Sequence, residues 1–283
     1  MISGGELMSS EENNCCCEVV TKESLIQGFT GEVIGTFLMC FLGIGAVATA
    51  TLYQAHTGPF QVGIVWGLAI AIAIYATRNL SCAHFNPAVT FAMCISKRCS
   101  WKNFPVYILG QFVGAILSAS ALWVFFADSV KKSLDAANLT MDVSTPASSI
   151  WIEVFPNTAN GVISMPVAAF AEALGVFILV MIIFSMTEGC NIGRPSDDLF
   201  PLFIGLTVTV LICTIGPMTD AGLNPARDLG PRVVGWFIGW KNIAFSTDAF
   251  IVYTIAPLIG AGLAAIFFTR VIEPMQNSRN NCC

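Results

Sequence analysis

The tripeptide Asn-Pro-Ala occurs twice in this chain, as Asn86-Pro87-Ala88 and as Asn224-Pro225-Ala226, each time within apolar sequence. Asparagine is a preferred N-cap residue and proline is preorganised for the first helical position, so each tripeptide predicts the start of a helix. A helix that begins at membrane depth needs its non-helical approach buried in protein or lining a water-filled cavity, because unsatisfied backbone groups cannot face lipid. The repeat therefore predicts two re-entrant half-helices beside a cavity.

The composition places the rest of the chain in a membrane. Of 283 residues, 55% are hydrophobic and 11% are charged, and the mean hydropathy is +0.73, which excludes a water-soluble globule of ordinary composition. A span needs about 20 apolar residues. Six stretches qualify, near 31–53, 60–78, 104–127, 166–187, 199–217 and 248–269. We expect an all-α membrane protein with six transmembrane helices and two half-helices.

The basic residues predict which way the chain faces. Six spans put both ends on one side, and most Lys and Arg residues flank the spans on that side, which predicts cytoplasmic termini. Residues 1–28 are acidic without an apolar core, so we expect a disordered cytoplasmic tail rather than a signal peptide, and 271–283 form a second tail. The connection 128–165 then lies outside and carries Asn138, a possible glycosylation acceptor.

The eleven cysteines show no paired spacing, so no disulfide framework is expected. The cluster Cys15-Cys16-Cys17 is typical of either reversible palmitoylation or reduced thiols in a loose tail, and these alternatives stay open.

The chain also contains an internal duplication. The segment 31–37 recurs as 171–177, and Glu32 and Glu172 lie 54 and 52 residues before Asn86 and Asn224. With three spans in each half, about 29–127 and 166–270, the second half enters from the opposite face, which predicts inverted repeats. The half-helix N-termini then meet near the midplane. Small residues at Gly110, Gly114 and 260–262 predict close helix packing.

Several motifs together resemble the aquaporin family. The segments 81–90 and 221–228 resemble its two signature loops, and the Arg227-Asp228 ending resembles the aquaglyceroporin branch, which includes the glycerol facilitators. The resemblance implies a homotetramer with one pore in each subunit. It also implies that Glu32 and Glu172 brace the re-entrant loops by accepting backbone hydrogen bonds; the alternative is ion or proton binding, as for other ionisable residues inside spans.

The half-helices predict which solutes are excluded and how a permeant is hydrogen-bonded. Each N-terminus directs about half a positive charge toward the centre, so protons and metal ions should be excluded there. The capping oxygens of Asn86 and Asn224 leave amide hydrogens to donate to a passing water or hydroxyl. The approach loops are expected to supply carbonyl acceptors, which replace lost hydration as in other narrow pores.

By resemblance, the selectivity filter consists of Trp66, Ile212, Ala221 and Arg227. Arg227 offers a fork of donors that holds hydroxyls and repels cations, and Trp66 offers a flat apolar wall, which together suit a polyol. Because Ile212 is apolar and Ala221 is small, the ring should admit more than water. Bacterial-type glycerol facilitators typically have Gly and Phe at those two positions, and the set present here looks closer to nodulin-26-like channels, which implies urea or metalloid acids as further permeants.

Five other residues lie close to the predicted pore. Asp220 replaces a usual Gly, and Tyr253 replaces a usual Pro. Asp220 is either a carboxylate that makes conductance depend on external pH or a solvated acid of the vestibule. His84 is either a pH switch or, as is common in the family, a packing residue of its loop. Asp228, with Arg232, is expected to brace the second half-helix.

These expectations converge on a passive plasma-membrane channel for glycerol and water. The alternatives are a water-selective aquaporin, an ion-coupled secondary transporter and a junctional protein that uses the same fold. The sequence shows no nucleophile triad, metal-ligand cluster or phosphate loop, so we expect no enzyme activity, cofactor, metal or nucleic-acid partner.

Overall fold

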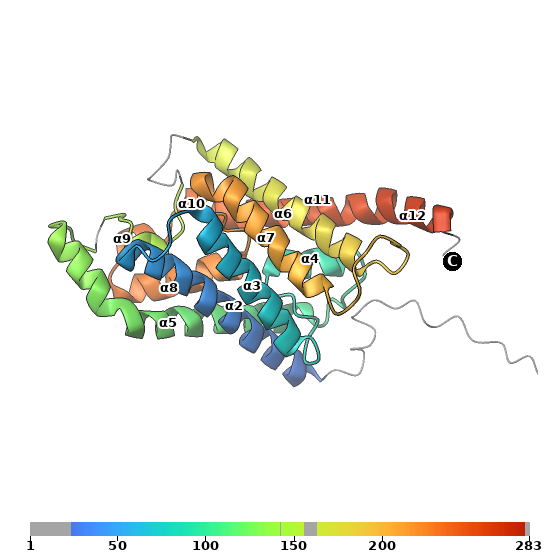
Figure 1. Cartoon of the computed structure of the whole chain (residues 1–283), viewed down its shortest axis with the longest axis horizontal. Coiled ribbons are helices and arrows are strands. Elements are labelled where there is room, and N and C mark those ends of the chain that lie inside the picture. Colours follow the sequence, from blue (N-terminus) through green and yellow to red (C-terminus); the bar gives the residue numbers. More distant parts are fainter. Residues whose placement is uncertain (1–23, 142, 156–162, 281–283) are drawn as a thin grey trace, which may run out of the picture.

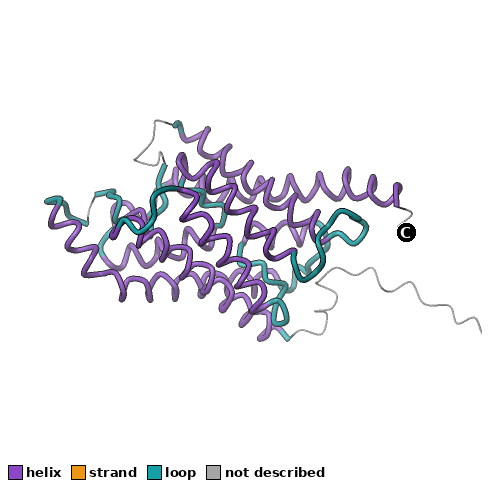
Figure 2. Tube along the Cα trace, in the orientation of Figure 1, coloured by secondary structure: helices purple, strands orange, loops and turns teal. Residues whose placement is uncertain are grey.

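The computed structural model describes residues 24–141, 143–155 and 163–280, so Cys15–Cys17 lie outside the described residues. Within these ranges all regular secondary structure is helical (Figure 2). Six helices are long and apolar enough to cross a membrane, which confirms the predicted six-span all-α fold. 

The elements keep the labels of Figure 1. The first five spans are α2 (Leu25–Tyr53), α3 (Pro59–Thr77), α5 (Phe104–Ala136), α6 (Met165–Thr187) and α7 (Phe200–Thr219). The sixth is one continuous helix built from α10 (Thr247–Phe250), η2 (Ile251–Ile255), α11 (Ala256–Phe267), η3 (Phe268–Ile272) and α12 (Glu273–Asn280). The half-helices are α4 (Pro87–Ile95) and α8 (Pro225–Ile238), and the short η1 (Ser148–Ile150) and α9 (Lys241–Ala244) lie in connections.

Three spans are longer than hydropathy predicted. α2 begins at Leu25 rather than near 31, since Ser24 and Gln27 form a capping box at its start. α5 continues past 127 to Ala136, and the last helix continues past 269 to Asn280. Hydropathy marks only the apolar part of a helix, and the extensions of α5 and of the last helix carry charged residues. The predicted connection 128–165 therefore begins inside a helix.

The two halves pack in the same way, as expected of inverted repeats. α2 packs against α5 and α3, and α6 packs in turn against α11 and α7. Glycines allow these close approaches: a Cβ added at Gly114 would lie 2.5 Å from the Val33 carbonyl oxygen, and one at Gly260 would overlap the Ala173 carbonyl. The predicted close packing at these glycines is confirmed.

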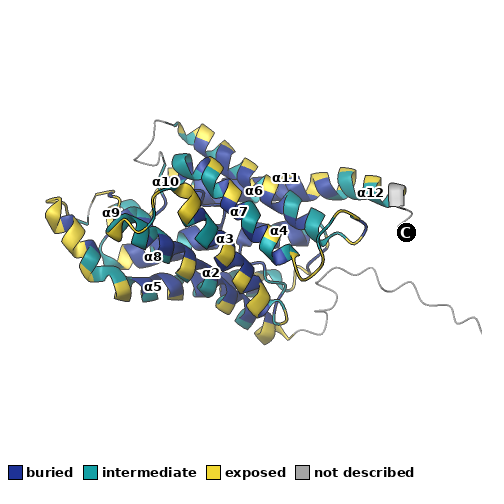
Figure 3. Cartoon of the chain, in the orientation of Figure 1, coloured by how far each residue is buried: buried dark blue, intermediate teal, exposed yellow. Residues whose placement is uncertain are grey.

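The half-helices lie inside the ring of spans and contact each other, α4 packing on α11 and α8 on α5. The start of α2 and the end of α12 lie at one end of the molecule (Figure 1), which we call the inner end. Exposed residues follow the outer faces of the spans (Figure 3), and many are large and apolar, such as Val124, Phe170 and Val210. Such faces suit contact with lipid, and the buried faces enclose the loops that precede α4 and α8.

Candidate functional site

A cavity of about 1160 Å³ passes the two half-helix loops and is lined by residues from both ends of the molecule. Val47 and His56 line it toward the outer end, and Arg98 and Glu273 line it toward the inner end. Asn86 and Asn224 line it between these limits. The predicted cavity beside the two tripeptides is therefore present.

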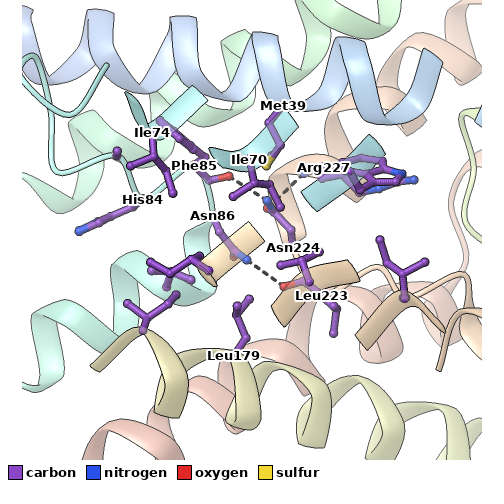
Figure 4. Close-up of a pocket in the computed structure, with 18 of the residues that line it drawn as sticks. Met39, Ile70, Ile74, His84, Phe85, Asn86, Leu179, Leu223, Asn224 and Arg227 are labelled. Carbon is purple, nitrogen blue, oxygen red and sulfur yellow. Dashed lines mark hydrogen bonds between the residues drawn. The ribbon is translucent and has the colours of Figure 1, made fainter. Parts of the chain in front are cut away.

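The two asparagines tie the halves of the protein together (Figure 4). Asn86 caps α4 by accepting from the Ala88 backbone N–H at 2.8 Å, and Asn224 caps α8 by accepting from the Ala226 N–H at 3.0 Å. Each Nδ2 also donates across the interface, Asn86 to the Leu223 carbonyl at 2.9 Å and Asn224 to the Phe85 carbonyl at 2.8 Å. An amide nitrogen carries two hydrogens, so one on each asparagine is used structurally and the second is left for a solute.

The approach loops share an unusual backbone conformation. Ala83 and Phe85 have φ of 54° and 52°, and Ala221 and Leu223, each 138 residues later, have φ of 54° and 53°. Left-handed conformations cost non-glycine residues roughly 1–2 kcal/mol each. The loops therefore need partners that hold them, and both find one in a glutamate.

Glu32 holds the first loop. Its Oε1 accepts from the Ser81 hydroxyl at 2.8 Å and the His84 N–H at 2.9 Å, and its Oε2 accepts from the Phe85 N–H at 2.8 Å and the Gln111 side-chain amide at 2.7 Å. Glu32 is fully buried, so its carboxylate has exchanged water for these four donors.

Glu172 holds the second loop in the same register. Its Oε1 accepts from the Thr219 hydroxyl and the Gly222 N–H, the latter at 3.0 Å, and its Oε2 accepts from the Leu223 N–H at 2.7 Å. Because three donors here occupy positions equivalent to three of those around Glu32, the two carboxylates have equivalent contacts.

His84 and Asp228 make local contacts. The His84 Nδ1 lies 3.2 Å from the Thr90 hydroxyl, and its ring meets the Tyr107 ring edge-on at 5.1 Å. Asp228 accepts from the Arg232 Nε at 2.6 Å within α8. Both residues thus pack the segments that carry them.

The four predicted filter residues line the cavity together. The Arg227 guanidinium carbon lies 4.9 Å from the centre of the Trp66 ring, within cation–π range. Gly43 leaves room for the Trp66 ring, which a Cβ at that position would overlap. Ile212 and Ala221 contribute only small or aliphatic surface to the ring.

The cavity wall below the filter is largely apolar. Ile70, Ile74, Leu179 and Met39 are seen around the two asparagines in Figure 4, and all four line the cavity. The donors and acceptors described above thus share the lining with aliphatic surface. An uncharged solute with a polar edge and a carbon edge matches this combination.

Glu153 is a site residue that the sequence analysis missed. It is fully buried, and its Oε1 lies 2.9 Å from the Arg227 Nη1. Its backbone carbonyl accepts from Arg232, which also donates to the Ala244 carbonyl. Burial raises the pKa of the Glu153 carboxyl well above its usual range, and the Arg227 charge opposes that rise. A sequence signal for this segment is the apolar run 150–152 inside the connection.

Asp220 and Tyr253 lie beside this pair. The Asp220 Oδ2 accepts from the Val154 N–H at 3.1 Å, and Asp220 lines the cavity. Burial raises the pKa of Asp220 to about 6, against the Val154 hydrogen bond and nearby arginine charges. Tyr253 is fully buried, and its hydroxyl donates to the Thr219 carbonyl at 2.9 Å, so it supports the second loop from behind.

The sequence analysis also missed an ion-pair cluster at the inner end. Arg98, which follows α4, lies 2.7 Å from a carboxylate oxygen of Glu188 and 3.2 Å from one of Glu273. The Arg98 guanidinium lies 4.6 Å from the Phe184 ring centre and 5.5 Å from that of Phe268. The cluster joins the loop after the first half-helix to α12.

The site can now be compared with known proteins. The family described as "Major intrinsic protein" matches residues 19–268. The chain belongs to the major intrinsic protein family. 

Named members of this family are similar to the chain over most of its length. The glycerol uptake facilitator protein of Escherichia coli (strain K12) is 36% identical over 250 residues, which cover 83% of each chain. The propanediol uptake facilitator of Salmonella typhimurium (strain LT2) is 34% identical over 249 residues, which cover 85% of this chain and 92% of the relative.

A solved structure from the family has the same fold. The aquaglyceroporin from Plasmodium falciparum has a TM-score of 0.79 and 27% sequence identity, and the match covers 90% of this chain and 100% of that one. The six spans and two half-helices described above are therefore an aquaporin-like fold.

Proposed function

We propose that this chain is a passive channel that conducts glycerol and water. The arrangement of Trp66 and Arg227, 4.9 Å apart on the cavity wall, carries the proposal. The guanidinium donates to the hydroxyls on one edge of a polyol, and the indole ring accepts the carbon edge. The names of the two bacterial relatives, which refer to glycerol and propanediol uptake, support the same solute class.

The other site residues have supporting roles in this proposal. The half-helices begin at Pro87-Ala88 and Pro225-Ala226, and their N-termini make the centre unfavourable for cations. Asn86 and Asn224 each donate one amide hydrogen to the passing solute. Glu32, Glu172 and Asp228 hold the loops and half-helices in place.

The proposal also covers further permeants, the membrane and the assembly. The small side chain of Ala221 favours urea and metalloid acids as additional permeants. The excess of Lys and Arg at the inner end favours cytoplasmic termini, and we place the protein in the plasma membrane as a homotetramer. The channel domain is about 29–270, with repeats of about 29–127 and 166–270.

A water-selective channel is the second candidate. Trp66 and Arg227 are only 7% and 5% exposed, which favours a narrow lumen at this level. The residue at position 212 distinguishes a glycerol channel from a water-selective one. A larger polar side chain in place of Ile212 would narrow the filter ring, which is already tight.

Stopped-flow light scattering on proteoliposomes tests the proposal. The wild-type protein should accelerate both glycerol and water flux over empty liposomes, and Ile212→His should reduce glycerol flux while keeping water flux. Ile212→Val is the conservative control and should keep both. Fast water flux with glycerol excluded from the wild type would favour the water-selective candidate.

A further inference from the structure

Asp220 links the second re-entrant loop to a connection from another part of the chain. It directly follows α7 with φ of 62°, and its Oδ2 accepts from the Val154 N–H at 3.1 Å. Val154 is the neighbour of Glu153, whose carboxylate lies 2.9 Å from Arg227. Asp220 therefore contacts the segment that presents the partner of the filter arginine.

This segment, residues 145–155, is called the strap here. It is anchored before Glu153 by Trp151, which is fully buried and donates from Nε1 to the Ala119 carbonyl at 3.2 Å. At Glu153 itself, the carbonyl accepts from Arg232. On the other side of Glu153, the strap is held by the hydrogen bond from the Val154 N–H to Asp220 and by the Phe155 ring, whose centre lies 6.2 Å from that of Tyr253. Asp220 therefore supplies the polar contact on this side and contributes to how firmly the Glu153 side chain is held.

We propose that Asp220 is a positioning residue for permeation. Through the strap, it fixes Glu153 against Arg227. Acid weakens the contact between Asp220 and the strap, so glycerol flux falls as the pH falls. The inference rests on the proposed glycerol function and deepens it. A loosened Glu153 leaves the Arg227 guanidinium without a fixed partner, and the Arg227 side chain then turns toward the lumen.

The direction of the pH effect follows from the chemistry of the carboxyl group. Burial raises the pKa of Asp220 to about 6, so the group is ionised at pH 7.5 and mostly protonated at pH 5. A carboxylate is a stronger acceptor than a neutral carboxyl, because hydrogen bonds to an ionised group are roughly twice as strong. The contact with Val154 is therefore strong above pH 6 and weak below it.

Other titratable groups surround Asp220. Arg227 and Arg232 face it from α8 and favour its ionised form. Glu153 from the strap and Tyr253 from η2 also interact with its charge. Protonation of Asp220 removes a negative charge beside Glu153, which favours the ionised form of Glu153, and it weakens the contact of Asp220 with the strap.

His56 also lines the outer part of the same cavity, and it provides a matched control. A pH dependence that comes from His56 would survive every change at Asp220.

The test is glycerol flux into proteoliposomes with equal pH on both sides, between pH 7.5 and 5, normalised to the pH 7.5 value of each variant. If flux follows the ionised fraction of Asp220, wild type should fall about tenfold. Asp220→Asn keeps the shape and an acceptor oxygen, tolerates positive φ and does not titrate, so its profile should be flat. Asp220→Gly removes the acceptor without backbone strain, and its flux should be low at every pH.

The outcomes separate the inference from the proposed function. His56→Asn should keep the wild-type profile. A wild-type pH profile in Asp220→Asn, or a flat one in His56→Asn, would overturn the inference. Wild-type flux that is fast but level across this pH range also overturns it and leaves the proposed function intact. Glycerol flux no faster than in empty liposomes at any pH would remove the proposed function itself.

Discussion

Replacing Glu32 with Gln isolates the contribution of its second carboxylate oxygen. The carboxylate accepts two hydrogen bonds on each oxygen, from Ser81 and His84 on Oε1 and from Phe85 and Gln111 on Oε2. Glutamine has nearly the same shape but one oxygen and one NH₂ group. With its oxygen in the Oε1 position, the NH₂ group faces two donors.

The loss of unfolding free energy in Glu32→Gln follows from the hydrogen bonds that the variant cannot make. A hydrogen bond to a charged group contributes about 1.5–3 kcal/mol. The Phe85 N–H loses its acceptor in any case, whereas Gln111 can recover a partner by flipping its amide. The free energy of unfolding should therefore fall by at least about 1.5 kcal/mol and by at most about 6 kcal/mol. Because Phe85 has positive φ, the loop that precedes α4 should relax and glycerol flux should fall as well.

The assay is thermal unfolding of the detergent-solubilised protein together with glycerol flux in proteoliposomes. Glu172→Gln should behave similarly, because the Leu223 N–H then loses its acceptor. Asp128→Asn is the matched control, since this carboxylate is fully exposed on the extension of α5 and its loss should change stability by less than about 0.5 kcal/mol. If Glu32→Gln unfolds and conducts like Asp128→Asn, the bracing argument is refuted.

Two further predictions concern the ends of the pore. Glu153→Gln leaves Arg227 buried without its ion partner. This variant should lose on the order of 3 kcal/mol of unfolding free energy, and its glycerol flux should be lower. Wild-type stability and flux in this variant would show that the pair is dispensable. Mercurials should block flux through Cys82, which lines the cavity and is more exposed than Cys190 in the same lining. Cys82→Ser should therefore resist them, while Cys213→Ser, at a residue outside the lining, should stay sensitive. Block that persists in Cys82→Ser would place the reactive thiol elsewhere.

The features predicted from sequence are those with a local or repeated signal. The spans follow from apolar length, and the half-helices follow from two caps at Asn86 and Asn224 with the same spacing to a glutamate. Glu153 could not be predicted in the same way, because its partner Arg227 is distant in the chain and the connection that carries it has no periodic pattern. The pairing of Arg98 with Glu273 could not be predicted either, because it depends on a helix that extends past its apolar part.

The central claim, passive glycerol conduction, is tested most directly by the initial rate of glycerol uptake into proteoliposomes as a function of glycerol concentration, with and without proton or sodium gradients. A channel predicts a rate that is proportional to concentration and unaffected by either gradient. A rate that saturates and increases with an ion gradient would contradict the account and indicate a coupled transporter.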